Sequence, residues 1–248
     1  MDMRRFLVCL VMGAGIFGSS PAMAQTLDGL PFSKRLKLAQ VGDEDAQMAV
    51  ALAYEQGEAA RLDLAEAAKW YRKAALNGNV EAQYRLARIV SKGAKGLTRD
   101  LPTAAKLYEA AAKSGHVDAQ NATGLLYQNG LGVSTDEAKA AEWYRKAADA
   151  KLAAAENNLG LLYLNGKGVL RDPKEAFKLF ERAANQGDGW GLNNLGGMYE
   201  MGWGVDKDPA KAATYYRQAL EKGVASAQSN LVRLDPNTAS VVAPPAPD

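Results

Sequence analysis

The sequence has only one cysteine and one histidine in 248 residues, and these two scarcities exclude several kinds of active site. The cysteine is Cys9, near the N-terminus, and we expect it to be lost by cleavage of the N-terminal segment. A Cys/His dyad and a Cys/His zinc site are then impossible. A Ser-His-Asp triad would need His116, which follows Gly115 where the pattern predicts a turn. We interpret His116 as a turn residue and expect no metal site and no cofactor.

An excess of charge of one sign is also lacking. The chain has 30 basic and 28 acidic residues, which gives a net charge of +2 at pH 7. This balance indicates neither a nucleic-acid partner nor attraction to a membrane surface. The composition, 48% hydrophobic and 23% charged, is typical of a packed soluble protein.

The first 24 residues have the pattern of a secretory signal peptide. Two arginines precede an apolar segment at residues 6–17, and residues 22–24 (AMA) provide a cleavage site, so the mature chain is expected to begin at Gln25. The apolar segment is too short to span a bilayer comfortably, so we expect no membrane insertion after cleavage. The predicted location is the periplasm, with full secretion as the alternative. Without Cys9 the mature chain would have no disulfide, and packing would have to stabilise it.

A period of 36 or 37 residues runs through most of the chain. Its copies start at Ala46, Ala82, Ala119, Ala155, Gly191 and Ala227. In the copy at residues 157–187, an apolar helical face ends at Gly166, and Asp172 followed by Pro173 opens a second helix. Neither helix could bury its apolar face alone, so the period predicts a stacked array of helix pairs.

Each full copy repeats the same helix signals. An aspartate stands seven residues before an aromatic or leucine-aromatic pair and is expected to cap the second helix, at Asp63, Asp100, Asp136, Asp172 and Asp208. Capping explains these carboxylates without a catalytic role. Glycine pairs of the form Gly-x-Gly recur in the turn between the helices and lack the context of a phosphate-binding loop, so they are interpreted as structural.

The organisation predicted from these signals has four parts. Residues 1–24 form the signal peptide and residues 25–32 a short leader. Residues 33–234 form the array, with half a repeat before the first start and another from residue 227. The proline-rich tail, residues 235–248, has too little to bury and is predicted to be disordered.

The motif LG-x-LY-x-x-G-x-GV-x-x-D-x-x-KA-x-x-WY-x-KAA-x-x-G, nearly complete in residues 124–148 and 159–184, resembles the Sel1-like repeat, a relative of the tetratricopeptide repeat. The resemblance implies an all-α, right-handed solenoid of antiparallel helix pairs, with about five full repeats and terminal half-repeats. It also implies that the first helices line a concave surface and that the function is protein–protein interaction. Similar bacterial proteins are exported scaffolds, regulators of envelope signalling, or factors that contact host cells.

Aromatic residues recur at the repeat period. The columns Tyr54, Tyr127, Tyr163 and Tyr199, and Trp70 and Trp143, are predicted to be core. Trp203 differs, because it lies in a turn where other copies have leucine or lysine. Its indole either packs on the next repeat or is an exposed anchor for a partner. The two alternatives are left open.

Partner-binding residues are expected where the repeat does not dictate the residue type. Counting each start as position zero, positions two, three, six, nine and ten are predicted to point away from the core. Asparagines occur there, at Asn121, Asn157, Asn158, Asn193 and Asn194. An amide offers a donor and an acceptor and could hold an extended peptide backbone. The alternatives are a hydrogen-bond ladder between repeats and simple solvation.

The second repeat departs most from the pattern and is basic. Arg85, Arg88 and Lys92 are spaced to lie along one helical stripe beside Tyr84. Such a stripe could pair with carboxylates of a partner. The alternative is a solvated charged face.

These patterns favour a binding protein over an enzyme. We expect an exported scaffold or regulator that binds a protein or peptide on the concave face, in envelope signalling or assembly. One alternative is a cell-wall or β-lactam-binding or hydrolysing enzyme that uses carboxylates. Family members linked to β-lactams have disulfide-bonded repeats, which this chain lacks. Another alternative is a secreted factor that contacts host proteins. The sequence leaves the oligomeric state open.

Overall fold

The computed structural model describes Leu27 and residues 29–234. The predicted signal peptide and proline-rich tail lie outside the described residues. In the described part the chain forms twelve helices and no strand, as the all-α prediction requires. They are α2 (Phe32–Gln40), α3 (Glu44–Gln56), α4 (Leu64–Leu76), α5 (Val80–Lys92), α6 (Leu101–Lys113), α7 (Val117–Asn129), α8 (Glu137–Asp149), α9 (Ala153–Asn165), α10 (Pro173–Asn185), α11 (Gly189–Met201), α12 (Pro209–Glu221) and α13 (Ser226–Leu234).

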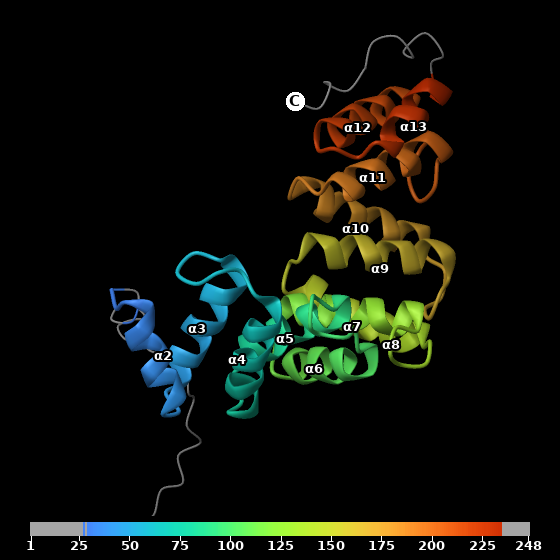
Figure 1. Cartoon of the computed structure of the whole chain (residues 1–248). Helices are drawn as coiled ribbons and strands as arrows, with labels where there is room; N and C mark the ends of the chain where they lie inside the picture. The colour runs from blue at the N-terminus through green and yellow to red at the C-terminus, as the bar shows by residue number, and fades with distance from the viewer. Residues whose placement is uncertain (1–26, 28, 235–248) are drawn as a thin grey trace, which may run out of the picture.

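The helices stack as pairs in one array that runs from α2 to α13 (Figure 1). Five pairs, from α3 with α4 to α11 with α12, form the full repeats, and α2 and α13 are the halves at the two ends. The odd-numbered helices are the first helices of the repeats and the even-numbered ones are the second helices. The solenoid of about five repeats is therefore confirmed.

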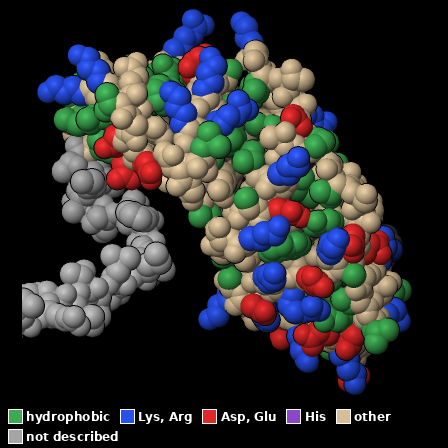
Figure 2. All heavy atoms as spheres, turned by 90° about the horizontal axis from the view of Figure 1, so that it is seen from below, with side chains coloured by type: hydrophobic (Ala, Val, Ile, Leu, Met, Phe, Trp, Pro, Cys, Tyr) green, Lys and Arg blue, Asp and Glu red, His purple; other side chains and the backbone are tan. Residues whose placement is uncertain are grey.

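The array is bent, with a hollow on one side in the space-filling view (Figure 2). Among first helices, α9 and α11 contact each other across the repeat boundary, and the second helices α8 and α10 make no comparable contact. At this boundary the first helices therefore lie closer together than the second helices. We call the exposed surface of the first helices the first-helix face.

Local capping sets the helix ends. The five aspartates predicted as N-caps all accept hydrogen bonds from backbone N–H groups in the first turn of α4, α6, α8, α10 and α12. His116 caps α7, because its Nδ1 accepts a hydrogen bond of 3.2 Å from the backbone N–H of Ala119. His116 therefore lies in a turn, as predicted, and has a specific role there. The first N–H groups of a helix have no acceptor inside the helix, and the His116 ring supplies one.

The Gly-x-Gly turns are structural, as predicted. At Gly168, which has φ of +67°, a Cβ would lie 2.1 Å from the backbone oxygen of Glu137 at the start of α8. Gly132 and Gly204 approach the preceding second helix in the same way. No side chain fits at this approach, so the glycine column sets the distance between consecutive repeats.

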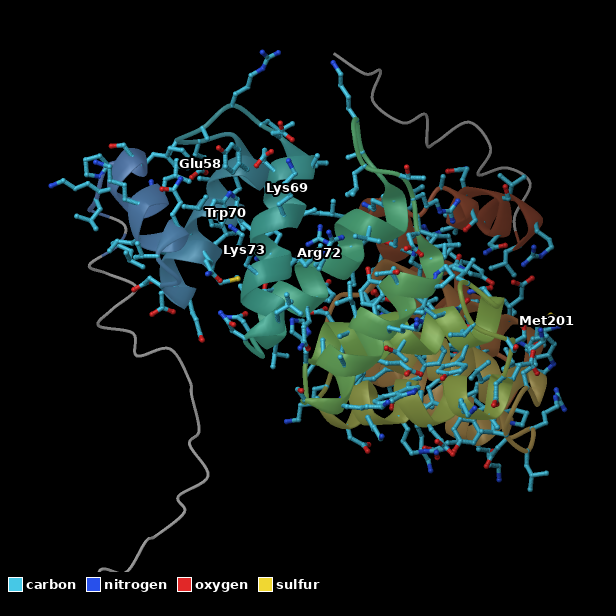
Figure 3. The ribbon with its side chains drawn as sticks, turned by 60° about the horizontal axis from the view of Figure 1, so that its bottom comes forward. Glu58, Lys69, Trp70, Arg72, Lys73 and Met201 are labelled. Atoms are coloured by element: carbon cyan, nitrogen blue, oxygen red, sulfur yellow. The ribbon has the colours of Figure 1, made fainter. Side chains whose placement is uncertain are left out.

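The tryptophan column is core, and the tyrosine column is partly so. Trp70 and Trp143 are 7% and 9% exposed. On α4 the Lys73 ammonium lies 3.7 Å from the centre of the Trp70 ring, and both residues are labelled in Figure 3. The column of Tyr54, Tyr127, Tyr163 and Tyr199 is only half-buried. These rings therefore border the core and also reach the surface.

Position nine was predicted to point outward, and this prediction is wrong. Glu200 at position nine of α11 is 8% exposed and accepts a hydrogen bond of 2.6 Å from the hydroxyl of Tyr216 on α12. Glu55 and Gln128 accept in the same way from Tyr71 and Tyr144. The fourth repeat has no tyrosine hydroxyl because Phe180 takes its place. Position nine is the apolar Leu164 there. The residue type at position nine therefore follows the second helix: it is a hydrogen-bond acceptor opposite a tyrosine hydroxyl and apolar opposite a phenylalanine.

Candidate functional site

An asparagine ladder crosses the first-helix face. Nδ2 of Asn158 donates to Oδ1 of Asn121 at 3.0 Å, and Nδ2 of Asn194 donates to Oδ1 of Asn157 at 2.7 Å. Asn230, which the sequence analysis missed, continues the ladder to Asn193 at 2.9 Å. Each bond joins position three of one repeat to position two of the repeat before it. The alternative of a ladder between repeats is therefore present in the structure.

The ladder leaves a regular set of amide atoms unused. Position-two asparagines use Oδ1 and keep Nδ2, and the position-three asparagines of repeats four and five use Nδ2 and keep Oδ1, whereas Oδ1 of Asn230 accepts a hydrogen bond from Arg233. Within the part of the chain that the structure describes, Nδ2 of Asn157 and Asn193 and Oδ1 of Asn158 and Asn194 have no hydrogen-bond partner. Repeats four and five thus each have one unused donor and one unused acceptor side by side, and a peptide backbone offers the two groups in return. Asn157 is only 8% exposed, so the prediction that position two points outward is wrong for this residue.

One residue of the basic stripe of repeat two, Arg85, is neutralised inside the chain. The Arg85 guanidinium lies 3.1 Å from Glu55 of the previous repeat and also forms an ion pair with Glu81. Arg88 lies over the ring of Tyr84, with 5.7 Å between the guanidinium carbon and the ring centre. The stripe was predicted to face a partner. Arg85 instead finds its carboxylates within the molecule, and Arg88 and Lys92 remain exposed.

His116 joins this cluster from the third repeat. Its ring stacks on Tyr84 with 4.3 Å between the centres, and its Nε2 lies 3.0 Å from a carboxylate oxygen of Glu81. Partial burial opposes the charge on Glu81, but hydrogen bonds from His116 and Arg85 outweigh burial and lower the pKa of its carboxyl. The cluster ties repeats one, two and three together, so its chemistry is structural.

A hollow of about 430 Å³ lies at the N-terminal end of the first-helix face. Leu27 lies against it and is 8% exposed. Three carboxylates, of Asp45, Glu58 and Glu81, line this repeat-one hollow, with Arg35 as the basic residue among its lining. The hollow is acidic, and the leader of the same chain forms part of its wall.

A second hollow, of about 300 Å³, lies at the C-terminal end. This repeat-five hollow is lined by residues of α9, α11, the turn after α11, α12 and α13: Leu164, Asn193, Asn194, Gly197, Met198, Glu200, Met201, Trp203, Tyr216, Asn230 and Arg233. Trp203 is 40% exposed and Met201 is 53% exposed. The indole of Trp203 therefore forms part of a wall of the hollow and remains accessible. Glu58 and Met201, one from each hollow, lie at opposite ends of the molecule (Figure 3).

The charges of the repeat-five hollow are paired. Arg233 donates to both carboxylate oxygens of Glu200, at 2.8 and 2.6 Å. These bonds outweigh the effect of burial and lower the pKa of Glu200. Burial, followed by the hydrogen bond to Glu200, raises the pKa of Tyr216. The group is therefore a neutral, saturated network that presents no unmatched charge.

Neither a metal site nor a membrane span emerges from the described residues. Between Leu27 and Leu234, no three His, Cys, Asp or Glu side chains are grouped to hold a metal ion. No helix in the same range is both long enough and apolar enough to cross a bilayer.

Comparison with known proteins identifies the repeat. The Sel1 repeat model matches residues 44–79, 80–116, 117–152, 153–188 and 191–224. A search of curated proteins gives no match. The structure is similar to that of c5321, a protective antigen present in uropathogenic Escherichia coli strains that displays an SLR fold, with 31% identity and a TM-score of 0.75. That match covers 88% of this chain but 45% of c5321, so this chain spans less than half of that protein.

A Sel1 repeat protein from Oxalobacter formigenes is similar along most of both chains. It has 27% identity and a TM-score of 0.73, and the match covers 81% of this chain and 86% of that one. The five consecutive matches to the repeat model extend over most of the chain and coincide with the five helix pairs of the structure. The chain belongs to the Sel1 repeat family.

Proposed function

We propose that the chain is a scaffold that binds a protein partner along its first-helix face and acts in the bacterial periplasm, in envelope signalling or assembly. Sel1 repeats are generally protein-interaction modules, and the family is typically not enzymatic. The proposed location rests on the signal-peptide pattern of residues 1–24. The mechanism is stoichiometric: the scaffold holds its partner in one place or one state.

The observation that carries this proposal is the row of unused amide atoms on α9 and α11. A donor and an acceptor recur together in repeats four and five, and an extended segment of a partner exposes N–H and C=O groups that can pair with both. The ladder bonds hold each amide in one orientation, so little side-chain freedom is lost on binding. A purely structural ladder needs only one of the two polar amide atoms, Oδ1 or Nδ2, of each of these asparagines.

The experiment is crosslinking of the full chain in cells, followed by purification and mass spectrometry after separation of periplasm from medium. The test variant is Asn157→Ala with Asn193→Ala, and the matched control is Asn185→Ala, an exposed asparagine at the end of α10. We expect one dominant partner in the periplasmic fraction, lost in the test variant and kept in the control. Circular dichroism and thermal melting confirm that both variants are folded.

Two outcomes contradict the proposal. If the same partner is recovered equally from the double variant, the partner does not use the asparagines. If the protein is abundant and folded but crosslinks to no specific protein, the scaffold function itself is wrong.

A further inference from the structure

The two hollows of the first-helix face occupy the same positions of the repeat, four repeats apart. Each is lined by positions two, three, six, seven, ten and twelve of one first helix and the turn after it. In repeat one these are Met48, Ala49, Leu52, Ala53, Gln56 and Glu58, and in repeat five they are Asn193, Asn194, Gly197, Met198, Met201 and Trp203. The surroundings of the repeat-one hollow therefore indicate what kind of side chain can lie at the repeat-five hollow.

Leu27 of the chain's own leader forms part of the wall of the repeat-one hollow. This side chain is 8% exposed and belongs to the apolar cluster that includes Val50, with Met48 and Leu52 packed against it. The leucine comes from the segment before α2, outside the repeats. These repeat positions thus border a leucine side chain that a separate segment of the chain delivers.

Gly197 leaves the repeat-five hollow without a side chain at position six. Repeats one, three and four have a leucine at position six (Leu52, Leu125 and Leu161), and the other two copies have an arginine (Arg88 and Arg233). A glycine inside a helix is unfavourable relative to alanine, so it calls for a reason. Its neighbour Gly196 has one, because a Cβ there would lie 2.8 Å from the ring of Tyr216. At Gly197 a Cβ would meet only the Tyr216 hydroxyl, at an ordinary 3.6 Å. Packing does not require Gly197, and its consequence is open space.

The lining determines the kind of group that fits there. Leu164, Met198, Met201 and Trp203 supply apolar surface. The one acidic and one basic side chain of the lining, Glu200 and Arg233, neutralise each other, so a charged ligand group would find no counter-charge. The unused amide atoms of Asn193 and Asn194 lie in the same lining, where the backbone beside an inserted side chain can reach them.

We propose that the repeat-five hollow binds one large aliphatic side chain, leucine or methionine, from an extended segment of the protein partner. The side chain lies over Gly197, where repeats one, three and four have a leucine, and the backbone on either side bonds to Asn193 and Asn194. This inference rests on the proposed function and specifies where on the first-helix face the partner is anchored.

The test uses a phage-displayed library of random twelve-residue peptides, selected on the full chain. Binding of each enriched peptide is then measured by fluorescence anisotropy. The test variant is Gly197→Leu, which gives repeat five the residue that repeats one, three and four already have at position six. The matched control is Ala154→Leu, which adds the same side chain at an exposed position of α9 outside the hollow.

We expect the enriched peptides to share a leucine or methionine at one position. Their affinity should fall at least tenfold with Gly197→Leu and stay unchanged with Ala154→Leu. Trp203→Ala, which removes a wall of the hollow without altering a helix, should also weaken binding, and it keeps the test valid if Gly197→Leu fails to fold.

The other outcomes separate this inference from the proposed function. Peptides that lose affinity for Asn157→Ala with Asn193→Ala but bind Gly197→Leu normally would overturn the aliphatic anchor and leave the scaffold proposal standing. Enriched peptides that share no large aliphatic residue would do the same. A library that yields no peptide specific for the first-helix face would contradict both.

Discussion

The two ends of the first-helix face are built from the same repeat positions, yet their hollows differ: one is acidic and borders the chain's own leader, and the other is apolar with its charges paired. At the N-terminal end, Leu27 lies against the repeat-one hollow, and Arg85 is bound to Glu55 and Glu81. At the C-terminal end, Gly197 leaves a hollow unfilled and Trp203 remains accessible beside it. The fold does not distinguish the two ends. The difference lies in residues that the repeat leaves free to vary, so those residues are where partner recognition belongs.

One structural device is common to both ends. Tyr71, Glu55 and Arg85 form a hydrogen-bonded chain from a second helix, through position nine, to the next first helix. Tyr216, Glu200 and Arg233 repeat the arrangement. Since Arg85 and Arg233 each belong to the following repeat, the device couples consecutive repeats near both ends of the array. The middle of the array does without it, and its fourth repeat has Phe180 and Leu164 instead.

The largest expected effect breaks the continuity between the two ends. Leu159 on α9 is 3% exposed, and Leu159→Arg would bury a charge with no partner. We expect a loss on the order of 4 kcal/mol in the free energy of unfolding. Urea denaturation followed by circular dichroism measures it. A melting curve identical to that of the unmodified chain would show that this face of α9 is not buried.

A second prediction sharpens the contrast between the middle and the ends. Phe180→Tyr places a hydroxyl in a fully buried site where position nine is Leu164 and offers no acceptor. We expect a loss of about 2 kcal/mol, the usual cost of an unsatisfied buried polar group. Adding Leu164→Gln copies the pairing of Tyr144 with Gln128 and should recover most of the loss. A double-mutant cycle of unfolding free energies measures this coupling, and additive effects would contradict it.

A third prediction concerns acid and the C-terminal end. The folded chain holds the pKa of Glu200 below its ordinary value of 4.5, chiefly through its hydrogen bonds to Arg233. Because the folded pKa is the lower one, the stabilisation is present above pH 4.5 and is lost as the pH falls through the folded value. Arg233→Ala should cost roughly 1 kcal/mol at neutral pH, since the arginine is partly solvated.

The readout is the melting temperature across the acid range. The difference between the unmodified chain and Arg233→Ala should shrink as the pH falls below 4.5. Arg217→Ala, at an exposed arginine of α12, serves as the control and should leave the pH dependence unchanged. A difference that stays constant with pH would show that Arg233 stabilises the chain without help from the charge on Glu200.

Most of the fold could be predicted because its signals are local. An aspartate caps the helix in which it lies, and the C′ glycine Gly166 ends its own helix with φ of +69°. Each rule needs only neighbouring residues. Position nine was misjudged because its environment is set by a residue sixteen positions later, although the pairing of Glu200 with Tyr216 and of Leu164 with Phe180 is visible in the sequence.

The candidate site was less predictable. The asparagine column could be read from the repeat, but which amide atoms remain unused depends on bonds that span 37 residues. Arg85 was read as available because the sequence does not show that Glu55 lies within 3.1 Å of it. The burial of Leu27 and the hollow at Gly197 are tertiary features. The first comes from a leader outside the repeat, and the second from a missing side chain among several helices.

The smallest expected effect tests the central contrast, because it asks whether Gly197 serves the fold or the hollow. Gly197→Ala should stabilise the chain by about 0.5–1 kcal/mol, since alanine is the better helix residue and its methyl group has room beside Tyr216. Gly196→Ala, one residue earlier, should destabilise it, because its methyl group would meet the Tyr216 ring at 2.8 Å. Chemical denaturation of both variants measures the change in the free energy of unfolding, which should be positive for Gly197→Ala and negative for Gly196→Ala. If the fold requires Gly196 but is more stable without Gly197, then Gly197 is explained by a ligand that binds beside it. Equal destabilisation by both substitutions would show instead that the packing of α11 requires Gly197, and the binding explanation would be wrong.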